Sequence, residues 1–229
     1  MLKYFGNRID PSISSGFALA ERAVKAMESK PVTPTTIIAH NDTPKLTVES
    51  FDNHVYFYAD VDTDRCLAMI KTIRELDSKL RMERETRWVG GDKHVPHPIW
   101  LHIQSGGGDL FAGLAIADQL SMIQTPIYSI IEGLCASAAT LISLSCEKRF
   151  IMPMGFMLIH QFKTALWGKH EEFKDEMKLQ EMLIEMLICF YMDHSKLGRD
   201  TVTEMLKHDT WFNASKAIDT GLVDEIWEG

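Results

Sequence analysis

The chain has 229 residues, and hydrophobic side chains make up 45% of them, which is enough for one large globular core. Its formal net charge is −8, from 24 basic and 32 acidic side chains. This acidic balance argues against nucleic acid as a partner. No apolar run reaches the length of a membrane span, so we expect no membrane partner either.

The N-terminus and the cysteines indicate a cytoplasmic protein. The first ten residues contain no apolar signal-peptide core. None of the four cysteines belongs to a C-x-x-C pair, and three lie in apolar surroundings, as is typical of thiols in a reducing compartment. His94 and His97 have no carboxylate or cysteine at ligand spacing, so we expect no metal and no other cofactor.

Residues 1–50 are expected to form an N-terminal extension. The spacing of apolar residues predicts a helix over Ser15–Met27, Pro31 and Pro34 interrupt it, and Thr36–His40 has the composition of a strand. Three roles are open for this extension: it could cap the fold, occupy a pore region or be a removable propeptide.

The following segments predict an α/β domain. Val55–Ala59 is a strand of the buried type, and Asp62–Lys79 has one apolar helical face. Residues 82–98 are polar, with two glycines and two prolines, and are expected to form a loop. Strand and helix patterns then alternate from Ile99 to Leu144, which predicts a mainly parallel sheet with crossover helices.

A glycine-rich turn, Ser105–Asp109, joins the predicted strand Ile99–Gln104 to a predicted helix, Leu110–Met122. Three consecutive glycines let the backbone turn tightly and approach a ligand closely, and their N–H groups can face an anion. The simpler interpretation is a flexible turn. A phosphate loop is a weak alternative, because no Gly-Lys-Ser/Thr follows.

Ser137 is the candidate nucleophile. It follows an apolar strand, Pro126–Ile131, that ends in a glycine, and it precedes a predicted helix over Ala138–Leu144. A hydrolase places its nucleophile and part of an oxyanion hole at such a turn, beside free backbone N–H groups. The alternative is an ordinary helix N-cap. Cys135 is a second possible nucleophile that nothing in the pattern supports.

Two further residues complete a candidate Ser-His-Asp triad. The apolar strand Met157–Gln161 carries His160 near its end, and Asp209 precedes two aromatic residues. Each residue alone is more often structural, because a strand-end histidine is usually a satisfied core or surface residue and an aspartate before threonine is usually a turn or cap. Between them, a methionine-rich helix over Glu171–His194 is either a core helix or one that needs partners on two sides.

Four segments, in this order, resemble the Clp protease proteolytic subunit, ClpP. They are similar to the family's Asn-Ser-Pro-Gly-Gly loop, its serine turn, its Lys-Arg-Phe and Met-Ile-His-Gln elements, and its closing Asp-Arg-Phe and Gly-Leu-Val-Asp. The matching segments are Ile103–Gly108, Gly133–Ala138, Lys148–Pro153 with Met157–Gln161, and Asp209–Ala214 with Gly221–Asp224. The resemblance extends over about Asn53–Trp227, and the ordered set is more specific than any one motif.

The resemblance implies a fold and an activity. The fold would be the α/β, ClpP/crotonase-like spiral of βαβ units, with a peptidase domain over 51–229 and a protruding handle helix over about 164–197. The activity would be that of a serine endopeptidase that hydrolyses peptides or unfolded protein inside stacked homo-oligomeric rings. The chain has no Walker A pattern, so any AAA+ unfoldase would be a separate partner.

The same resemblance assigns residues to roles. Ser137 would be the nucleophile, His160 the general base and then the general acid, and Asp209 the group that orients and stabilises the imidazolium. The oxyanion hole would be formed by the backbone N–H groups of Gly108 and Ala138. The substrate would be contacted by Gly107, Phe162 and Trp167.

Two departures from the family lead to further expectations. Residues 162–167 replace a glycine-rich stretch, so the bulky Phe162 and Trp167 would narrow the range of peptides accepted. His208 replaces an arginine that couples the rings, so ring stacking would weaken as pH rises and the histidine loses its proton. Two other functions are open: a catalytically weak assembly or regulatory subunit, and a crotonase-type acyl-CoA enzyme. The intact triad argues against the first, and the Ser137 turn argues against the second.

Overall fold

The computed structural model describes residues 48–89, 97–161 and 169–228. These residues belong to one compact unit. The predicted helix Ser15–Met27 and strand Thr36–His40 lie outside the described residues. The first described strand begins at Val48, so the division between an extension and a domain at residue 50 stays a prediction.

The centre of the unit is a mixed, mainly parallel sheet. Its strands are β1 (Val48–Phe51), β2 (His54–Phe57), β3 (Ile99–Ser105), β4 (Ile127–Ala136), β5 (Lys148–Ile151), β6 (Phe156–Ile159), β7 (Thr210–Asn213) and β8 (Glu225–Ile226). The strand order is β1-β2-β3-β4-β5-β8, while β6 pairs with the end of β4 and β7 pairs with β6. Among the described pairings, β1 with β2 and β6 with β7 are antiparallel and the others are parallel. The predicted fold class is therefore confirmed.

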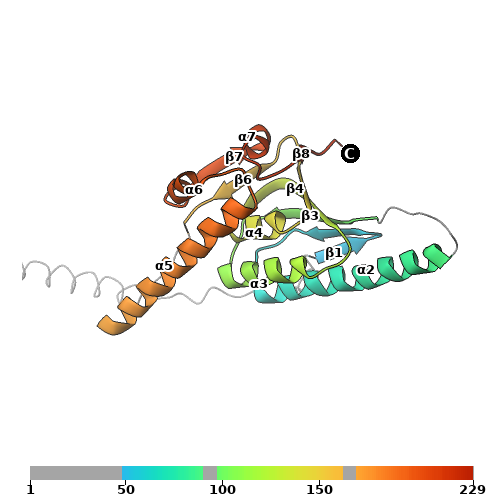
Figure 1. The fold of residues 1–229 in the computed structure, drawn as a ribbon, viewed down its shortest axis with the longest axis horizontal. Coiled ribbons are helices and arrows are strands. Elements are labelled where there is room, and N and C mark those ends of the chain that lie inside the picture. The colour runs from blue at the N-terminus through green and yellow to red at the C-terminus, as the bar shows by residue number, and fades with distance from the viewer. Residues whose placement is uncertain (1–47, 90–96, 162–168, 229) are drawn as a thin grey trace, which may run out of the picture. The chain divides into compact units, whose positions relative to one another are not determined.

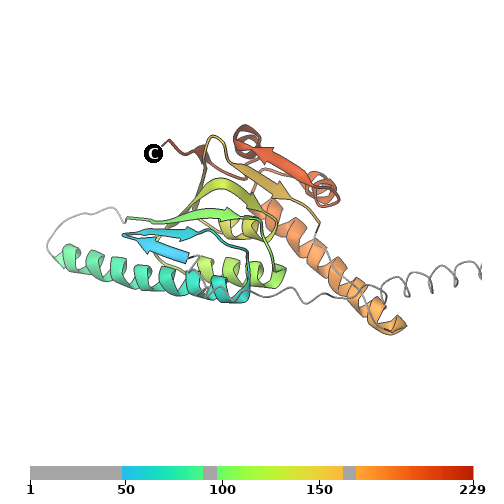
Figure 2. The ribbon, with the colours of Figure 1, turned by 180° about the vertical axis from the view of Figure 1, so that it is seen from behind.

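The helices are α2 (Thr63–Val89), α3 (Leu110–Ser121), α4 (Ala138–Leu144), α5 (His170–Asp193), α6 (Arg199–Met205) and α7 (Ala214–Asp219). Figures 1 and 2 show α2 and α3 on one side of the sheet. The helix α2 packs on β1, β2 and β3, and α4 packs on β3, β4 and β6, while α3 lies against α2 and α4. No helix in the described ranges combines the length and the apolar composition needed to cross a bilayer.

The helix α2 is longer than its sequence pattern predicted. A loop was expected from residue 82, but the helix continues to Val89, so this expectation is wrong for residues 82–89. Residues 80–89 contain neither glycine nor proline and are mostly good helix formers, so polarity alone does not end the helix. The rest of the expected loop, residues 90–96, lies outside the described residues.

The buried core lies between the sheet and these helices. In β3 the side chains of Ile99, Leu101 and Ile103 are fully buried and alternate with residues of the opposite face, as the two-residue period of a strand requires. That opposite face carries aromatic rings in contact with one another, among them Trp100 and Trp227. One face of the sheet therefore supports the helices, and the other presents rings and polar groups.

The sequence predicted that the strand β4 ends at its glycine. In the structure β4 continues past the glycine. Gly133 has φ 71°, and the strand continues beyond it to Ala136. Before Gly133, β4 pairs with β5, and after it β4 pairs with β6. The positive φ, which glycine adopts without a steric penalty, accompanies this change of partner. The exchange brings β6 beside the last residues of β4, which is where the candidate nucleophile lies.

The helix α5 protrudes from this body, as expected for a handle. Figure 1 shows its N-terminal half extending away from the sheet. Its buried residues, Leu187, Ile188 and Tyr191, lie in its C-terminal half. The beginning of the expected handle, residues 164–168, lies outside the described residues.

Candidate active site

Ser137 occupies the turn between β4 and α4 in a strained backbone conformation. Its φ and ψ are 54° and −128°, which a residue with a side chain rarely adopts. The backbone holds this turn, because the Ser137 N–H donates to the carbonyl of Leu158 at 2.8 Å. The Ser137 side chain makes no capping hydrogen bond to α4, so the simple N-cap interpretation does not describe what the hydroxyl does.

A chain of hydroxyl groups connects this turn to α5. The Thr140 hydroxyl donates to the carbonyl of Ser137 at 2.6 Å. It therefore accepts from the Tyr191 hydroxyl, 2.7 Å away. Burial raises the pKa of Tyr191, so its hydroxyl keeps its proton. The C-terminal part of α5 is thus connected by hydrogen bonds, through Thr140, to the backbone of Ser137.

The glycine loop is held against Val61 and runs close to Ser137. The Val61 N–H donates to the Gly107 carbonyl at 2.8 Å, and the Asp109 N–H donates to the Val61 carbonyl at 2.7 Å. Gly107 and Gly108 have φ values of 91° and 150°, in the region that favours glycine. A Cβ on Gly107 would lie 2.6 Å from the Cβ of Ser137, so only glycine permits this approach.

Two backbone N–H groups beside Ser137 have no acceptor among the described residues. The parallel bridge between Gly108 and Val61 uses the groups that flank Gly108, so the N–H of Gly108 itself points to the opposite side. The N–H of Ala138 is the first in α4, and such groups have no partner within their helix. These are the two donors that the resemblance predicts for an oxyanion hole, and such N–H groups can stabilise developing negative charge.

His160 lies next to Ser137 because of the strand register. The parallel strands β4 and β6 pair Ala136 with Leu158, so Ser137 and His160 both follow the carboxyl ends of neighbouring strands. The His160 Nδ1 lies 2.6 Å from the carbonyl oxygen of Gln161. Because a carbonyl only accepts, Nδ1 carries the proton and Nε2 keeps a free electron pair. That tautomer suits a general base, although no hydrogen bond joins the two side chains in the described residues.

The third predicted residue, Asp209, is brought to the same end of the sheet. The antiparallel register of β6 and β7 pairs Ile159 with Thr210, which places Asp209 opposite His160. The Asp209 side chain is exposed and makes no hydrogen bond to His160 in the described part of the chain. The topology therefore brings the three triad candidates together, while the hydrogen bonds of a completed triad are not formed.

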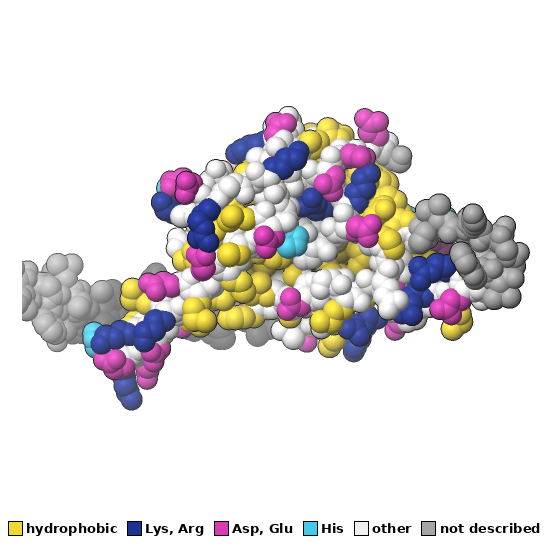
Figure 3. Space-filling view, in the orientation of Figure 1, with side chains coloured by type: hydrophobic (Ala, Val, Ile, Leu, Met, Phe, Trp, Pro, Cys, Tyr) yellow, Lys and Arg dark blue, Asp and Glu magenta, His cyan; other side chains and the backbone are white. Residues whose placement is uncertain are grey.

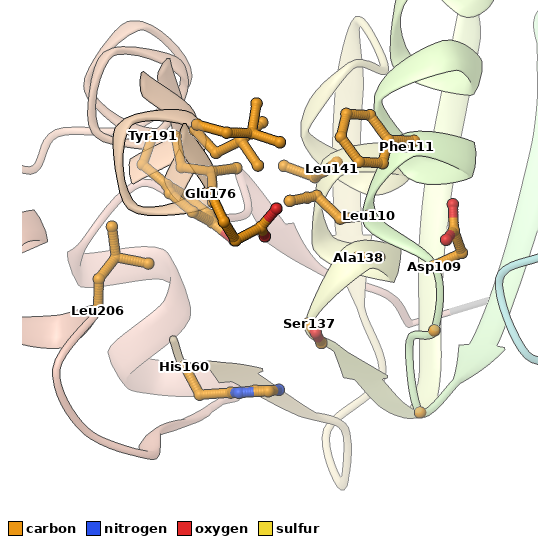
Figure 4. Close-up of a pocket in the computed structure, with 15 residues that line it drawn as sticks. Asp109, Leu110, Phe111, Ser137, Ala138, Leu141, His160, Glu176, Tyr191 and Leu206 are labelled. Atoms are coloured by element: carbon orange, nitrogen blue, oxygen red, sulfur yellow. The ribbon is translucent and has the colours of Figure 1, made fainter. Parts of the chain in front are cut away.

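Ser137 and His160 open into one cavity of about 470 Å³. Figure 4 shows both side chains at one end of it, with α3 and α4 on one side and α5 on the other. In Figure 3, hydrophobic side chains gather where α5 meets these helices. Among the described residues that line it, leucine is the commonest type, and the titratable ones are Asp109, His160, Glu176 and Tyr191.

Glu176 is a charged lining residue that sequence analysis missed. It belongs to the predicted handle helix, but nothing in that acidic and apolar segment indicates which carboxylate faces the cavity. Phe162 and Trp167, the predicted specificity residues, lie outside the described residues. His208 is exposed, with its Nε2 3.3 Å from Glu204, and its role in ring stacking stays a prediction.

The alternative nucleophile, Cys135, is not placed to act on a ligand in the cavity. Cys135 is fully buried and does not line the cavity. Burial raises the pKa of the Cys135 thiol, so it is not a thiolate at neutral pH. Within the described ranges, no group of three or more histidine, cysteine, aspartate or glutamate side chains is arranged to hold a metal ion.

Comparison with known proteins gives one consistent family. The profile of the Clp protease family matches residues 90–229. The chain is 37% identical over 136 residues to the ATP-dependent Clp protease proteolytic subunit 2 of Treponema denticola, a match that covers 56% of this chain and 66% of that protein. It is 32% identical to the protein of the same name from Treponema pallidum, covering 58% and 68% of the two chains. It is 30% identical to the ATP-dependent Clp protease proteolytic subunit of Lactococcus lactis, covering 57% and 67%.

Proposed function

The chain belongs to the Clp protease family, and from this premise we propose that it is a serine endopeptidase with Ser137, His160 and Asp209 as its triad. The observation that carries the proposal is the strand register. It sets Ser137 and His160 at the ends of neighbouring strands, in one cavity, with Asp209 opposite His160. A serine at a strained turn, a histidine and a carboxylate opposite that histidine are the three groups that a hydrolase triad requires.

The proposed reaction has two halves. The Ser137 Oγ attacks the peptide carbonyl carbon while His160 Nε2 takes the hydroxyl proton. The carbonyl oxygen becomes an oxyanion that accepts hydrogen bonds from the N–H groups of Gly108 and Ala138. The C–N bond then breaks, His160 returns the proton to the leaving amine, and an acyl-enzyme remains. A water molecule repeats the attack, with His160 again as base, and releases the acid and free Ser137.

Asp209 has a defined task in this scheme. When His160 takes up a proton, its Nδ1–H must turn from the Gln161 carbonyl toward a carboxylate that stabilises the imidazolium. Catalytic hydrogen bonds are often loose in the absence of substrate and tighten when it binds. The exposed position of Asp209 opposite His160 is compatible with such a movement.

Assembly, partners and location are parts of the same proposal. The relatives are named proteolytic subunits of ATP-dependent proteases. We accordingly expect this chain to form a homo-oligomeric chamber that receives peptides or unfolded protein from a separate ATP-driven partner. A reducing, cytoplasmic compartment suits its four cysteines, which are all free thiols.

Labelling with a serine-reactive fluorophosphonate tests the proposal. The wild-type protein should acquire one adduct, on Ser137, and should cleave fluorogenic peptides. The variant Ser137→Ala should lose both. The matched control is Ser145→Ala, at the other end of α4, whose hydroxyl donates to the carbonyl of Leu141. Labelling on another residue, or equal hydrolysis by the Ser137→Ala protein, would refute the assignment.

A further inference from the structure

Glu176 places a carboxylate in the candidate active-site cavity. The residue lies on α5, in the part that protrudes from the body, and it lines the cavity with Ser137 and His160. Figure 4 shows its side chain directed from α5 into the space above these two residues. The side chain is half-buried, so its charge is only partly screened by solvent.

The charge of Glu176 is not compensated within the described part of the chain. It makes no ion pair and no hydrogen bond there. The neighbouring lysines of α5 are engaged elsewhere, because Lys174 pairs with Glu171 at 3.0 Å and Lys178 with Asp175 at 3.4 Å. No lysine or arginine is among the described residues that line the cavity.

The other carboxylate that lines the cavity, Asp109, already accepts a hydrogen bond from the protein backbone. Asp109 caps the N-terminus of α3 and accepts a hydrogen bond from the Ala112 N–H at 2.6 Å. The helix dipole and this bond stabilise its negative charge. A ligand that brought a positive charge into the cavity would therefore find its partner in Glu176.

The surroundings of Glu176 suit a long side chain with a charged end. Leu110, Leu141, Leu179 and Leu183 line the same cavity and offer apolar contact. Lysine and arginine bury an aliphatic stem along such surfaces while their charged group binds a carboxylate. We propose that Glu176 makes this site selective for peptides that carry lysine or arginine near the bond to be cleaved. The inference rests on the proposed peptidase function and adds a substrate class to it.

A different role for Glu176 makes a different prediction. If its charge acted only by raising the basicity of His160, its removal would slow the cleavage of all peptides by one factor. Selectivity requires instead that the loss depends on the charge of the substrate. Arginine and citrulline have nearly the same shape and differ in charge, so paired peptides separate the two roles.

The test uses fluorogenic peptide pairs in which each position around the scissile bond is in turn arginine or citrulline. At one position at least, the wild-type kcat/KM should be about fivefold or more higher for arginine, as expected for a charge-assisted bond at a half-buried site. Glu176→Gln should bring this ratio close to one. Glu181→Gln, on the same helix but outside the cavity, should keep the wild-type ratio. Glu176→Lys should favour a glutamate-containing peptide over its glutamine counterpart.

Binding to the Ser137→Ala protein gives the same comparison without turnover. Arginine peptides should bind to it more tightly than citrulline peptides, and the additional exchange Glu176→Gln should remove the difference. Equal rates and equal binding for both peptides in the wild-type background would overturn the inference, as would a preference that survives Glu176→Gln. These results would leave peptidase activity and the labelling of Ser137 intact. Loss of labelling and of all hydrolysis would instead refute the proposed function.

Discussion

Ser137 keeps a strained conformation because its neighbours hold it there. Its carbonyl accepts from both the N–H and the hydroxyl of Thr140, and its own N–H is bonded across to β6. A non-glycine residue at positive φ costs about 1 to 3 kcal/mol, which the surrounding bonds must offset. The result is a serine whose backbone is fixed, which lines the cavity and whose hydroxyl does not cap the helix.

The contact between His160 and Gln161 leads to a graded prediction for the triad. The Gln161 carbonyl already holds the Nδ1–H tautomer, so Asp209→Asn should keep His160 able to act as a base. The variant would still lose the charge that stabilises the imidazolium. We expect Asp209→Asn to lower kcat by about 10⁴-fold, and His160→Ala to lower it roughly a hundredfold further.

Steady-state hydrolysis of one fluorogenic peptide by the two variants provides the measurement. Fluorophosphonate labelling of Asp209→Asn serves as the control, because Ser137 and His160 are both present in it and slow labelling should remain. Unchanged kcat in Asp209→Asn would remove this residue from the triad.

The glycines of the loop Ser105–Asp109 differ in how much space a side chain would have. A Cβ on Gly107 would meet the Ala136 carbonyl and the Ser137 Cβ, each at 2.6 Å, and its φ is positive. A Cβ on Gly106 would have nothing within 4 Å. Gly107→Ala should therefore lower the free energy of unfolding by more than about 2 kcal/mol, while Gly106→Ala should change it by less than about 1 kcal/mol. Denaturant unfolding of both variants measures the contrast, and equal stabilities would mean that the loop can relax away from Ser137.

A partly buried polar network around His102, on the face of the sheet that α2 does not cover, gives a prediction about pH. The His102 Nδ1–H donates to Glu132 at 2.7 Å, and its Nε2 accepts from the His54 Nδ1–H at 2.8 Å. The Tyr58 hydroxyl donates to the other oxygen of Glu132, and the Tyr56 ring stacks on His102. Burial, together with His54, lowers the pKa of His102 to about 4. His102 is therefore neutral at pH 7, and its contact with Glu132 is a hydrogen bond to a carboxylate.

This shift makes stability depend on pH in a definite direction. In the unfolded chain the pKa of His102 returns to about 6.5, so the unfolded state takes up the proton first as pH falls. The stability that the neutral ring provides is complete above pH 6.5 and is lost as pH falls toward 4. Glu132 opposes this trend, because burial raises its pKa and the folded state then protonates more readily.

The two effects can be separated in a Glu132→Gln background. The two proteins to compare are Glu132→Gln and the double variant that also carries His102→Gln. Their free energies of unfolding should be measured at the same protein concentration. Between pH 7 and pH 5, the protein that retains His102 should lose about 2 kcal/mol relative to the one that lacks it. A difference that is independent of pH would show that His102 has similar pKa values in the folded and unfolded chains.

The surface of α5 points to assembly of the molecule. Apart from Leu179, which lines the candidate active-site cavity, its large exposed apolar residues are Phe173, Met177, Met182, Met186 and Met192. So many exposed apolar side chains on one helix are unusual on a monomer and indicate that another surface covers them. We expect this surface to be α5 of a second copy, so the protein should be a homo-oligomer at micromolar concentration.

Met182 and Met122 form a matched pair for this test, with 69% and 66% of their surfaces exposed. Met182→Glu puts a charge among the exposed apolar side chains of α5 and should weaken assembly by about tenfold or more. Met122→Glu, at the end of α3, should not change it. Sedimentation velocity over a concentration series measures both variants, and a monomeric wild-type protein would contradict the prediction.

Local pattern was enough for much of the fold. The helix Ala138–Leu144 was predicted with the bounds that the structure has, and the predicted strand before the glycine loop ends one residue from the end of β3. These elements depend on propensities and periods that act between near neighbours in the chain. The same reasoning missed the continuation of β4 past Gly133, because that part of the strand is stabilised by its pairing with β6. It also missed the extension of α2 to Val89, because polar residues without a glycine or proline do not end a helix.

For the candidate active site too, some features follow from local sequence and others from contacts between distant residues. The sequence by itself determined the residue types and their order: glycines that can approach a ligand closely, a serine at a strand-to-helix turn, a histidine near the end of a strand, and an aspartate before two aromatic residues. Only the tertiary structure decided that β4 changes partner at Gly133 and so brings His160 beside Ser137, and that α5 turns Glu176 toward them. Strand register and the rotation of a helix about its axis are set by contacts between residues far apart in the chain, and a local pattern does not record them.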